Sequence, residues 1–227
     1  MNTGNIAVIP ARGGSQRIPR KNIKLLNGKP LIAYSIETAI ETNLFDRIIV
    51  STDDLEIAAV AKEWGAETPF MRPDDLADHF TGTTPVMQHA LRTLINQQSK
   101  IEKACLIYAT CPLLRASDIL DGYQALKKTP LSFAATTYDF PVQRALCKRG
   151  GKLQPMYPDY IGKRSQDLEE AIHDAGQFYW GHVEQWLSNP NFFSGMATPI
   201  MLARHRIQDL DTEEDWQRLV NIVSSIE

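Results

Sequence analysis

The hydrophobic positions of this chain gather in short runs that are separated by longer segments of mixed character. NIAVIPA at 5–11 is the first such run, and RIIVST at 47–52 and ACLIYAT at 104–110 resemble it in length and composition. Apolar runs of this length are typical of buried strands. The sequence therefore predicts strands at 5–11, 47–52, 104–110, 131–138 and 176–181.

Between these runs, apolar residues recur with the spacing of amphipathic helices. Ile32, Ile36 and Ile40 follow Pro30 at intervals of four, and proline is favourable at the start of a helix. A second helix is predicted after a cap at Asp53 or Asp54, with Ile57, Ala61 and Trp64 on one side and Gly65 at its end.

Three more helices follow from the same periodicity. One opens at Thr84-Pro85, and one is capped by Ser117 and runs to about Lys128. The last runs from about Thr212 to Ser225 and begins with a Thr-x-x-Asp pattern. The inward positions predicted for the first and last of these helices are Met87, Leu91, Leu94, Ile95, Trp216, Leu219, Val220 and Val223.

Because strands and helices alternate, we expect an α/β fold of three layers around a mostly parallel sheet. Ligands bind beyond the carboxyl ends of the strands in such sheets. The alternation stops at about 140–175, which is rich in proline and glycine and predicts a hairpin arm inserted into a single domain of residues 1–227. Since such an arm must bury its apolar face, a homodimer is expected.

Composition limits the classes of function. The formal net charge of −3 gives no global basic field for nucleic acid. Cys105, Cys111 and Cys147 form no CxxC pair, which argues against a zinc site or a disulfide framework and favours a reducing compartment, with Cys105 in the core. No signal peptide is recognisable and the apolar stretch at 104–114 is too short for a membrane span, so we expect a cytoplasmic protein without membrane contact.

The loop IPARGGSQRIPRKN at 9–22 concentrates cations directly after the first predicted strand. The chain has no GxGxxG and no GxxxxGK[ST], which excludes the usual dinucleotide and P-loop motifs and disfavours an oxidoreductase. A Gly-Gly loop can still present backbone N–H groups to phosphate. The planar guanidinium of Arg12 suits phosphate oxygens, and the ammonium group of Lys21 adds a compact positive charge. The alternative is a solvated basic surface, which we prefer for Arg17, Arg20 and Lys24.

An acidic pair near the C-terminus suggests a metal. Asp209 and Asp211 stand two residues apart, so in an extended segment their side chains point to one side. Mg²⁺ binds through one or two carboxylates together with substrate phosphates. The alternative is that these acids only favour the start of the last helix, which is how we interpret Glu213 and Glu214.

Together these residues resemble a known family, the cytidylyltransferases that activate nonulosonic (sialic-acid-like) sugars, a branch of the Rossmann-like nucleotide-diphospho-sugar transferase fold. The resemblance spans the whole chain and is specific because its motifs occur in one order. They are IPARGGSQRIPRKN (9–22), GKPLIAYSI (28–36), FDRIIVSTDD (45–54), MRPDDLA (71–77), TGTTP (81–85), RSQDLEEA (164–171) and DLDTEED (209–215).

The sugar half of the chain looks more like the branch of the family that acts on pseudaminic acid. The segments PFMRPDDLADHFTGTTPV and HDAGQFYWG carry this likeness. The N-acetylneuraminate branch has an RPNG-type segment whose asparagine contacts sugar, and here His173-Asp174-Ala175-Gly176 replaces it. A lysine of that branch is also replaced in Val142-Gln143-Arg144.

The resemblance implies transfer of CMP from CTP to a nonulosonic acid, with Mg²⁺ as cofactor and pyrophosphate as the second product. It implies catalytic roles for Arg12, Lys21, Asp209 and Asp211, with the last two as metal ligands and no dedicated general base. It implies nucleotide contacts by Ala11, Arg12, Gly13, Gly14, Ser15, Lys21, Asn22, Arg72, Thr83, Tyr108 and Thr110. The candidates for sugar contacts are Gln143, Arg144, Arg164 and Gln177.

Alternatives stay open at several of these positions. Asn22 could simply form a turn, Arg72 could be a helix-end cation, and Tyr108 could be a core residue. Arg144 and Arg164 could equally serve the dimer arm, and the five histidines show no metal-binding spacing. The rival functions are the same reaction on N-acetylneuraminic, legionaminic or another 3-deoxy sugar acid, and a non-catalytic nucleotide sensor.

Overall fold

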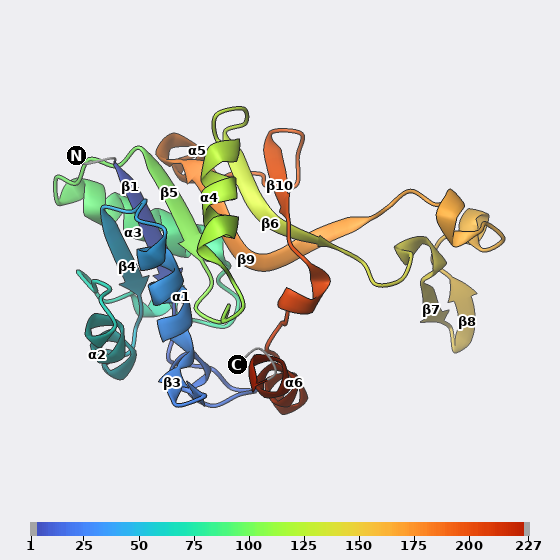
Figure 1. Cartoon of the computed structure of the whole chain (residues 1–227), viewed down its shortest axis with the longest axis horizontal. Coiled ribbons are helices and arrows are strands. Elements are labelled where there is room, and N and C mark those ends of the chain that lie inside the picture. Colours follow the sequence, from blue (N-terminus) through green and yellow to red (C-terminus); the bar gives the residue numbers. More distant parts are fainter. Residues whose placement is uncertain (1–3, 225–227) are drawn as a thin grey trace.

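A mixed six-stranded sheet forms the centre of the molecule, in a computed structural model that describes residues 4–224. β9 runs antiparallel to both of its neighbours, β5 and β6, and the remaining pairs are parallel. The predicted mostly parallel sheet is therefore confirmed (Figure 1). In spatial order the strands are β10 (Ala197–Met201), β6 (Leu131–Thr137), β9 (Ile172–His182), β5 (Lys103–Ile107), β1 (Asn5–Pro10) and β4 (Arg47–Ser51).

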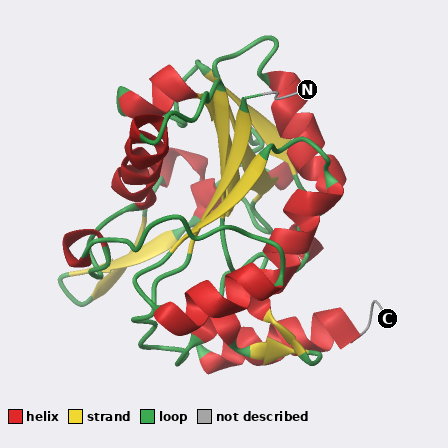
Figure 2. Ribbon diagram, turned by 90° about the vertical axis from the view of Figure 1, so that its left-hand side faces the viewer, coloured by secondary structure: helices red, strands yellow, loops and turns green. Residues whose placement is uncertain are grey.

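Helices lie on both sides of this sheet (Figure 2). The side chains of β1 alternate between two cores, because successive residues of a strand point to opposite faces. Ala7 and Ile9 pack in one core and Ile6 and Val8 in the other. The first core is covered by α1 (Leu31–Glu41), α2 (Leu55–Glu63) and α4 (Ala116–Ala125), and the second by α3 (Thr83–Asn96) and α5 (Val183–Leu187).

The C-terminal helix α6 (Glu213–Ser224) packs on the N-terminal basic loop instead of on the sheet. Trp216 and Leu219 share a third apolar cluster with Ile18 and Leu26. The predicted Thr-x-x-Asp start is confirmed, since the Thr212 N–H donates to Asp215 at 2.9 Å. The expected end of this helix at Ser225 lies outside the described residues.

Several expectations at the helices were wrong in detail. Ile40 and Ile95 are 45% and 40% exposed, because a spacing of four drifts away from the buried side of a helix with 3.6 residues per turn. Ser117 does not cap α4; the Asp118 carboxylate accepts the Arg115 N–H at 3.0 Å instead. Asp54 does cap α2, by accepting the N–H groups of Glu56 and Ile57.

Short helices, strands and turns whose hydrophobic residues show no clear periodicity were not predicted. These are α5, β10, the β2–β3 hairpin (Leu25–Leu26 and Lys29–Pro30), and 3₁₀ turns at Lys21–Ile23, Asp74–Leu76, Val142–Arg144, Pro158–Tyr160, Ser165–Asp167 and Arg204–Arg206. Each contains too few residues to show a periodicity. Cys105 is fully buried in the core, as expected.

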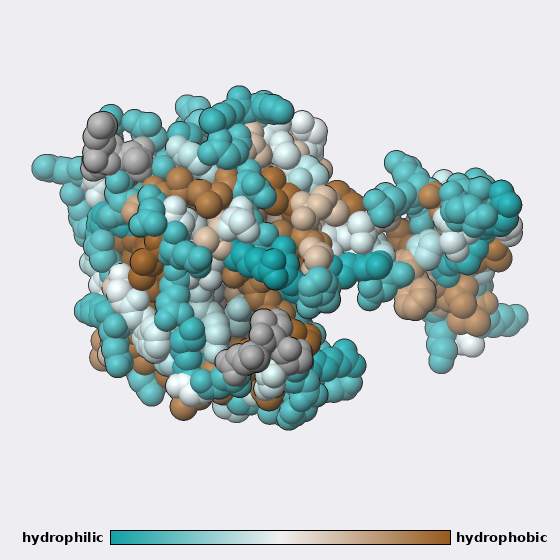
Figure 3. Space-filling view, in the orientation of Figure 1, coloured by the Kyte–Doolittle hydropathy of each residue, from teal (hydrophilic) through white to brown (hydrophobic). Residues whose placement is uncertain are grey.

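The segment between β6 and β9 projects away from the sheet (Figure 1). It carries an antiparallel hairpin of β7 (Leu146–Arg149) and β8 (Lys152–Pro155). Apolar side chains lie on its surface (Figure 3), among them Leu146, Leu153 and Met156. Within residues 4–224, no helix has both the length and the apolar character to cross a membrane.

Candidate active site

A cavity of about 310 Å³ opens where β1 and β5 end, at the carboxyl edge of the parallel strands. Pro10, the last residue of β1, lines it, and so does Ala109 just beyond β5. This is the edge at which the fold predicted a ligand. Eight of the predicted nucleotide contacts line this cavity, which we call the nucleotide cavity after that prediction: Arg12, Ser15, Lys21, Asn22, Arg72, Thr83, Tyr108 and Thr110.

Four cations line the nucleotide cavity, namely Arg12, Arg17, Lys21 and Arg72, against one acidic lining residue, Asp78. This local excess of positive charge on a chain of net charge −3 suits a small ligand with several negative charges. Arg17 was predicted to be a solvated surface residue, and its side chain is 67% exposed although it borders the cavity. The guanidinium of Arg12 is held by the backbone carbonyl of Asp78.

Arg72 is nearly buried and does not end a helix, as the alternative interpretation required. Its guanidinium donates to the hydroxyl and the carbonyl of Ser51 at the end of β4, and it precedes the 3₁₀ turn Asp74–Leu76. Burial lowers the pKa of Arg72 to about 10, although the charge of Asp53 opposes the shift. The side chain therefore stays charged at neutral pH and presents a fixed cation to the cavity.

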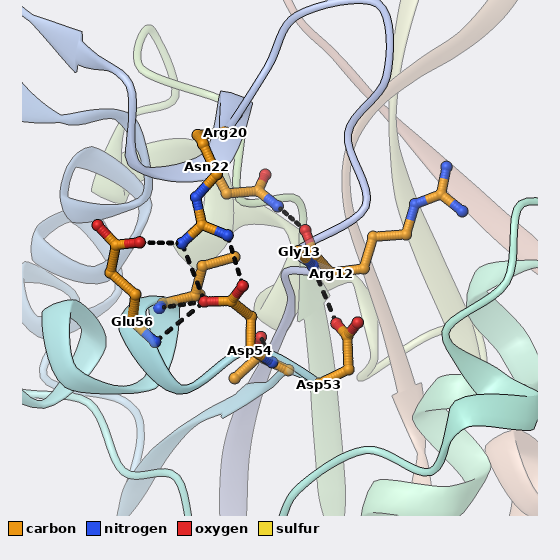
Figure 4. Close-up of polar contacts among 9 residues, drawn as sticks. Arg12, Gly13, Arg20, Asn22, Asp53, Asp54 and Glu56 are labelled. Carbon is orange, nitrogen blue, oxygen red and sulfur yellow. Dashed lines mark hydrogen bonds and ion pairs between the residues drawn. The ribbon is translucent and has the colours of Figure 1, made fainter.

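The loop that follows β1 is held by polar contacts with the loop that follows β4 (Figure 4). The N–H of Gly13 donates to Asp53 at 2.9 Å, and the N–H of Ser15 donates to the Gly13 carbonyl at 2.9 Å. These two N–H groups therefore have partners within the protein, and the contact of the Gly-Gly loop with phosphate remains a prediction. Asn22 is buried and donates to the carbonyl of Arg12 at 2.9 Å, so it fixes the backbone that carries Arg12.

A second set of polar contacts, made by ion pairs, holds the end of this loop that is farther from β1 in the chain. Arg20, in the left-handed region with φ of 55°, pairs with both Asp54 and Glu56 of α2 (Figure 4). The hydrogen bond from Arg20 lowers the pKa of Asp54 to about 2. A Cβ on Gly13 would lie 2.7 Å from the Asp54 carboxylate, so this close approach requires glycine.

Asp209 and Asp211, the two acids expected to bind metal, lie near the ammonium group of Lys21. Burial lowers the pKa of Lys21, while Asp211 and Asp209 both oppose that shift, so both carboxylates face the same ammonium group. Lys21 also donates to the Leu210 carbonyl between them at 2.5 Å. No group of three or more His, Cys, Asp or Glu suited to a metal occurs within 4–224. A carboxylate pair beside a lysine predicted to bind phosphate fits a cation that takes its remaining ligands from substrate phosphate and water.

A second cavity of about 440 Å³ shares Thr83 and Tyr108 with the nucleotide cavity. We call it the adjoining cavity. Its wall contains Asp174, Tyr179 and aromatic residues of the segment after α5, and sequence reasoning assigned no role to them. The HDAGQFYWG motif was the only signal at these positions, and its individual residues could not be placed from it.

The predicted sugar contacts are not brought together within one chain. Gln143 and Arg144 lie in the 3₁₀ turn before β7 and donate to the carbonyls of Glu169 and Lys163. Arg164 pairs with Asp167 on the arm. Gln177 is buried in β9 and donates to the Arg206 carbonyl at 3.3 Å. These four assignments remain predictions.

A mostly parallel sheet with a cationic cavity at its carboxyl edge defines a nucleotide-binding α/β protein. The same architecture occurs in a solved structure described as CMP:2-keto-3-deoxy-manno-octonic acid synthetase complexed with CTP. The TM-score is 0.72 at 16% identity, covering 98% of this chain and 99% of that one. At this identity the likeness concerns the fold, and it confirms the predicted fold class.

Residues 6–145 match the family described as Cytidylyltransferase, and the chain belongs to this family of nucleotidyltransferases. A pseudaminic acid cytidylyltransferase of Campylobacter jejuni is 41% identical over 94% of this chain and 93% of its own length. The CMP-N,N'-diacetyllegionaminic acid synthase of Legionella pneumophila is 31% identical over 93% and 92%. The family resemblance inferred from the motifs is thus confirmed.

Proposed function

We propose that the protein transfers CMP from CTP to pseudaminic acid and releases pyrophosphate. The observation that carries this proposal is a pair of neighbouring cavities that share Thr83 and Tyr108. One is lined by four cations and suits a triphosphate, and the other lies across Thr83 and Tyr108 and can hold a second substrate beside it. The 41% identity to a pseudaminic acid cytidylyltransferase supports this choice of sugar.

The reaction follows from positioning and charge. The anomeric hydroxyl of the sugar acid attacks the α-phosphorus of CTP in line, and the bond to the departing pyrophosphate breaks. Arg12 and Lys21 line the nucleotide cavity, where they would hold the triphosphate and stabilise the negative charge that develops on the leaving group. Asn22 and Asp53 act on the loop backbone and keep Arg12 in place.

The acid pair suits a divalent cation, for which we propose Mg²⁺. Asp209 and Asp211 would hold it, and when bound it would neutralise phosphate charge and lower the pKa of the attacking hydroxyl.

The projecting hairpin supports a homodimer. A two-stranded hairpin is marginally stable by itself in water, and Leu146 and Leu153 on this one are 54% and 66% exposed. A second copy of the chain would cover these side chains. The residues predicted to contact the sugar from the arm would then lie at or near that interface, namely Gln143, Arg144 and Arg164. A contact with the sugar and a contact with the second copy of the chain both remain open for them.

Pyrophosphate release from CTP and Mg²⁺ tests the function, with pseudaminic acid and N-acetylneuraminic acid compared side by side. We expect release with pseudaminic acid. Release only with N-acetylneuraminic acid would keep the reaction and overturn the sugar. CTP binding without release for pseudaminic, N-acetylneuraminic, legionaminic or 2-keto-3-deoxy-manno-octonic acid would favour a nucleotide sensor.

A further inference from the structure

Arg206 and Asp118 form a largely buried ion pair near the acidic segment. The two terminal nitrogens of the Arg206 guanidinium donate to the two carboxylate oxygens of Asp118, at 2.5 and 3.0 Å. The two side chains are only 12% and 10% exposed. A pair with two parallel hydrogen bonds holds its partners in one relative orientation.

Asp118 is a firm attachment point because it belongs to α4. Its carboxylate also accepts the N–H of Arg115 at 3.0 Å, and the next residue, Ile119, is fully buried in the core that α4 shares with the sheet. A side chain on a packed helix is held more precisely than one on a loop. The turn Arg204–Arg206 after β10 is therefore fastened to a rigid element.

The segment that follows Arg206 crosses a large part of the molecule. β10 is an edge strand and stands four strand positions from β1, which is roughly 20 Å at the usual spacing of strands. Figure 1 shows the chain descending from β10 through a short turn to α6. Along this path, the acid pair has to reach the ammonium group of Lys21 in the loop after β1. Contacts along the crossing therefore decide where the two carboxylates stand.

Asp209 lies between two anchored residues of this crossing. On one side, Leu210 is 1% exposed in the apolar cluster beneath α6. On the other side, Arg206 is held through its side chain by Asp118, and its carbonyl accepts a hydrogen bond from Gln177 of β9 at 3.3 Å. Loss of the ion pair would therefore loosen the chain on one side of Asp209.

The ion pair stands apart from the predicted nucleotide contacts. Of the described residues, those that line the nucleotide cavity include neither Arg206 nor Asp118. A buried ion pair also adds little to the free energy of unfolding compared with an apolar pair of the same size. An effect on where the acidic segment lies explains this pair better than stability alone.

We propose that Arg206 is a positioning residue for the divalent cation, because its ion pair with Asp118 sets the position of Asp209 in the proposed metal site. This inference rests on the proposed function and adds to it a residue that contacts neither substrate nor cation. A carboxylate that is displaced or loosely held binds a metal more weakly, since the ligands of Mg²⁺ have to meet a nearly ideal geometry.

The test measures the affinity for Mn²⁺ of the protein with CTP, by electron paramagnetic resonance of the free ion and with a titration of CTP alone subtracted. Arg206→Lys keeps the charge but cannot form the two parallel hydrogen bonds. Asp118→Asn keeps the size and one acceptor oxygen. Arg47→Lys is the matched control, because Arg47 pairs in the same way with Glu67 at the opposite edge of the sheet.

Three further measurements separate positioning from folding. They are the Tm, the Kd of CTP without metal, and the Mg²⁺ concentration that gives half-maximal pyrophosphate release. We expect Arg206→Lys and Asp118→Asn each to weaken Mn²⁺ binding about tenfold and to raise the required Mg²⁺ concentration by a similar factor. The Kd of CTP and kcat at saturating Mg²⁺ should stay within about twofold of the wild type.

The double variant Arg206→Lys, Asp118→Asn should bind Mn²⁺ about as well as either single variant, because both remove one interaction. Arg47→Lys should bind Mn²⁺ as the wild type does. Wild-type Mn²⁺ affinity in the single variants, with or without a lower Tm, would overturn the inference, and so would additive losses in the double variant. If one single variant fails to fold, the other decides by the same comparison.

Failure of the proposed function gives a different result. A wild-type protein that binds CTP and Mn²⁺ but releases pyrophosphate with no sugar acid would overturn the function. The Mn²⁺ titration of the variants would still decide whether Arg206 positions the metal site.

Discussion

The guanidinium of Arg17 lies 2.6 Å from the carboxylate of Asp211. Through this ion pair the basic loop near the N-terminus and the acidic segment before α6 touch directly. The contact between Lys21 and the Leu210 carbonyl at 2.5 Å lies beside it. The groups proposed for phosphate and those proposed for metal therefore form one polar cluster, and a metal bound by Asp211 has to compete with Arg17 for the carboxylate.

Arg17→Gln should therefore strengthen metal binding. An ion pair between solvent-exposed side chains contributes at most about 1 kcal/mol of free energy. Without this competing pair, we expect Mn²⁺ to bind the protein up to roughly fivefold more tightly. Electron paramagnetic resonance of free Mn²⁺ during a titration measures this. Lys24→Gln is the control, because Lys24 pairs with Glu213 away from the acid pair. Weaker Mn²⁺ binding in Arg17→Gln would contradict the competition.

Arg12 should be required for turnover but not for folding. Arg12→Ala removes a planar donor that we propose holds the triphosphate, and loss of one such donor costs about a hundred- to a thousandfold in kcat. Arg12→Lys keeps the charge without the planar fork and should recover part of that loss. Pyrophosphate release and the Tm are measured together, and near wild-type turnover in Arg12→Ala would remove Arg12 from the site.

The two neighbouring loop glycines should respond differently to alanine. A Cβ on Gly13 would lie 2.7 Å from the Asp54 carboxylate, whereas one on Gly14 would lie 3.8 Å from His79. We expect Gly13→Ala to shift the loop, to destabilise the protein by about 1–3 kcal/mol, and to weaken CTP binding at least tenfold. Gly14→Ala should change both little. Calorimetric titration with CTP and thermal melting check this, and equal effects of the two variants would show that the contact with Asp54 is unimportant.

Asp54 should make stability depend on pH in the acid range. Its pKa in the folded protein is about 2, below the ordinary value of 3.8, so folding favours the ionised form. The stabilisation is complete above about pH 5 and is lost as the pH falls from about 4 to 2. Asp54→Asn can still cap α2 but carries no charge, so its urea denaturation midpoint should fall less between pH 5 and pH 3 than that of the wild type. An equal fall would show that Asp54 contributes nothing to acid sensitivity.

The arm should determine the oligomeric state. Leu153→Glu places a charge on an exposed apolar side chain of β8, and we expect it to convert a dimer into a monomer in light scattering after gel filtration. Lys152→Glu, the adjacent exposed position, is the matched control and should remain dimeric. A wild-type protein that is monomeric at micromolar concentration would contradict the proposed dimer.

Many helices and strands could be predicted from the sequence because the patterns that indicate them lie within a few neighbouring residues. The apolar runs that became β1, β4 and β6 need only their own composition, and the Asp54 and Thr212 caps need only residues two or three positions away. The short elements α5 and β10 were missed because they contain no full period. The antiparallel direction of β9 also has no local signal, since it depends on which neighbours the strand pairs with.

Some residues of the candidate site could likewise be recognised from the sequence, and others could not. Arg12 and Lys21 stand in a recognisable motif and could be proposed as site residues from the sequence, and so could the acid pair at Asp209 and Asp211. Arg17 and Arg20 stand in the same motif, yet one lines the nucleotide cavity and the other ties the loop to α2. Nothing in the spacing of these two arginines distinguishes their roles.

Strand and helix periodicity and ordered motifs are properties of neighbouring residues, so the class of fold, the family and the basic loop could be inferred from the sequence. The folded arrangement was needed to show that Arg72 is buried against Ser51 and that Asp174 lines a cavity beside the nucleotide cavity. It also decided that Arg17 meets Asp211. Each of these facts depends on contacts between residues far apart in the chain, and such contacts exist only once the sheet and its loops are assembled.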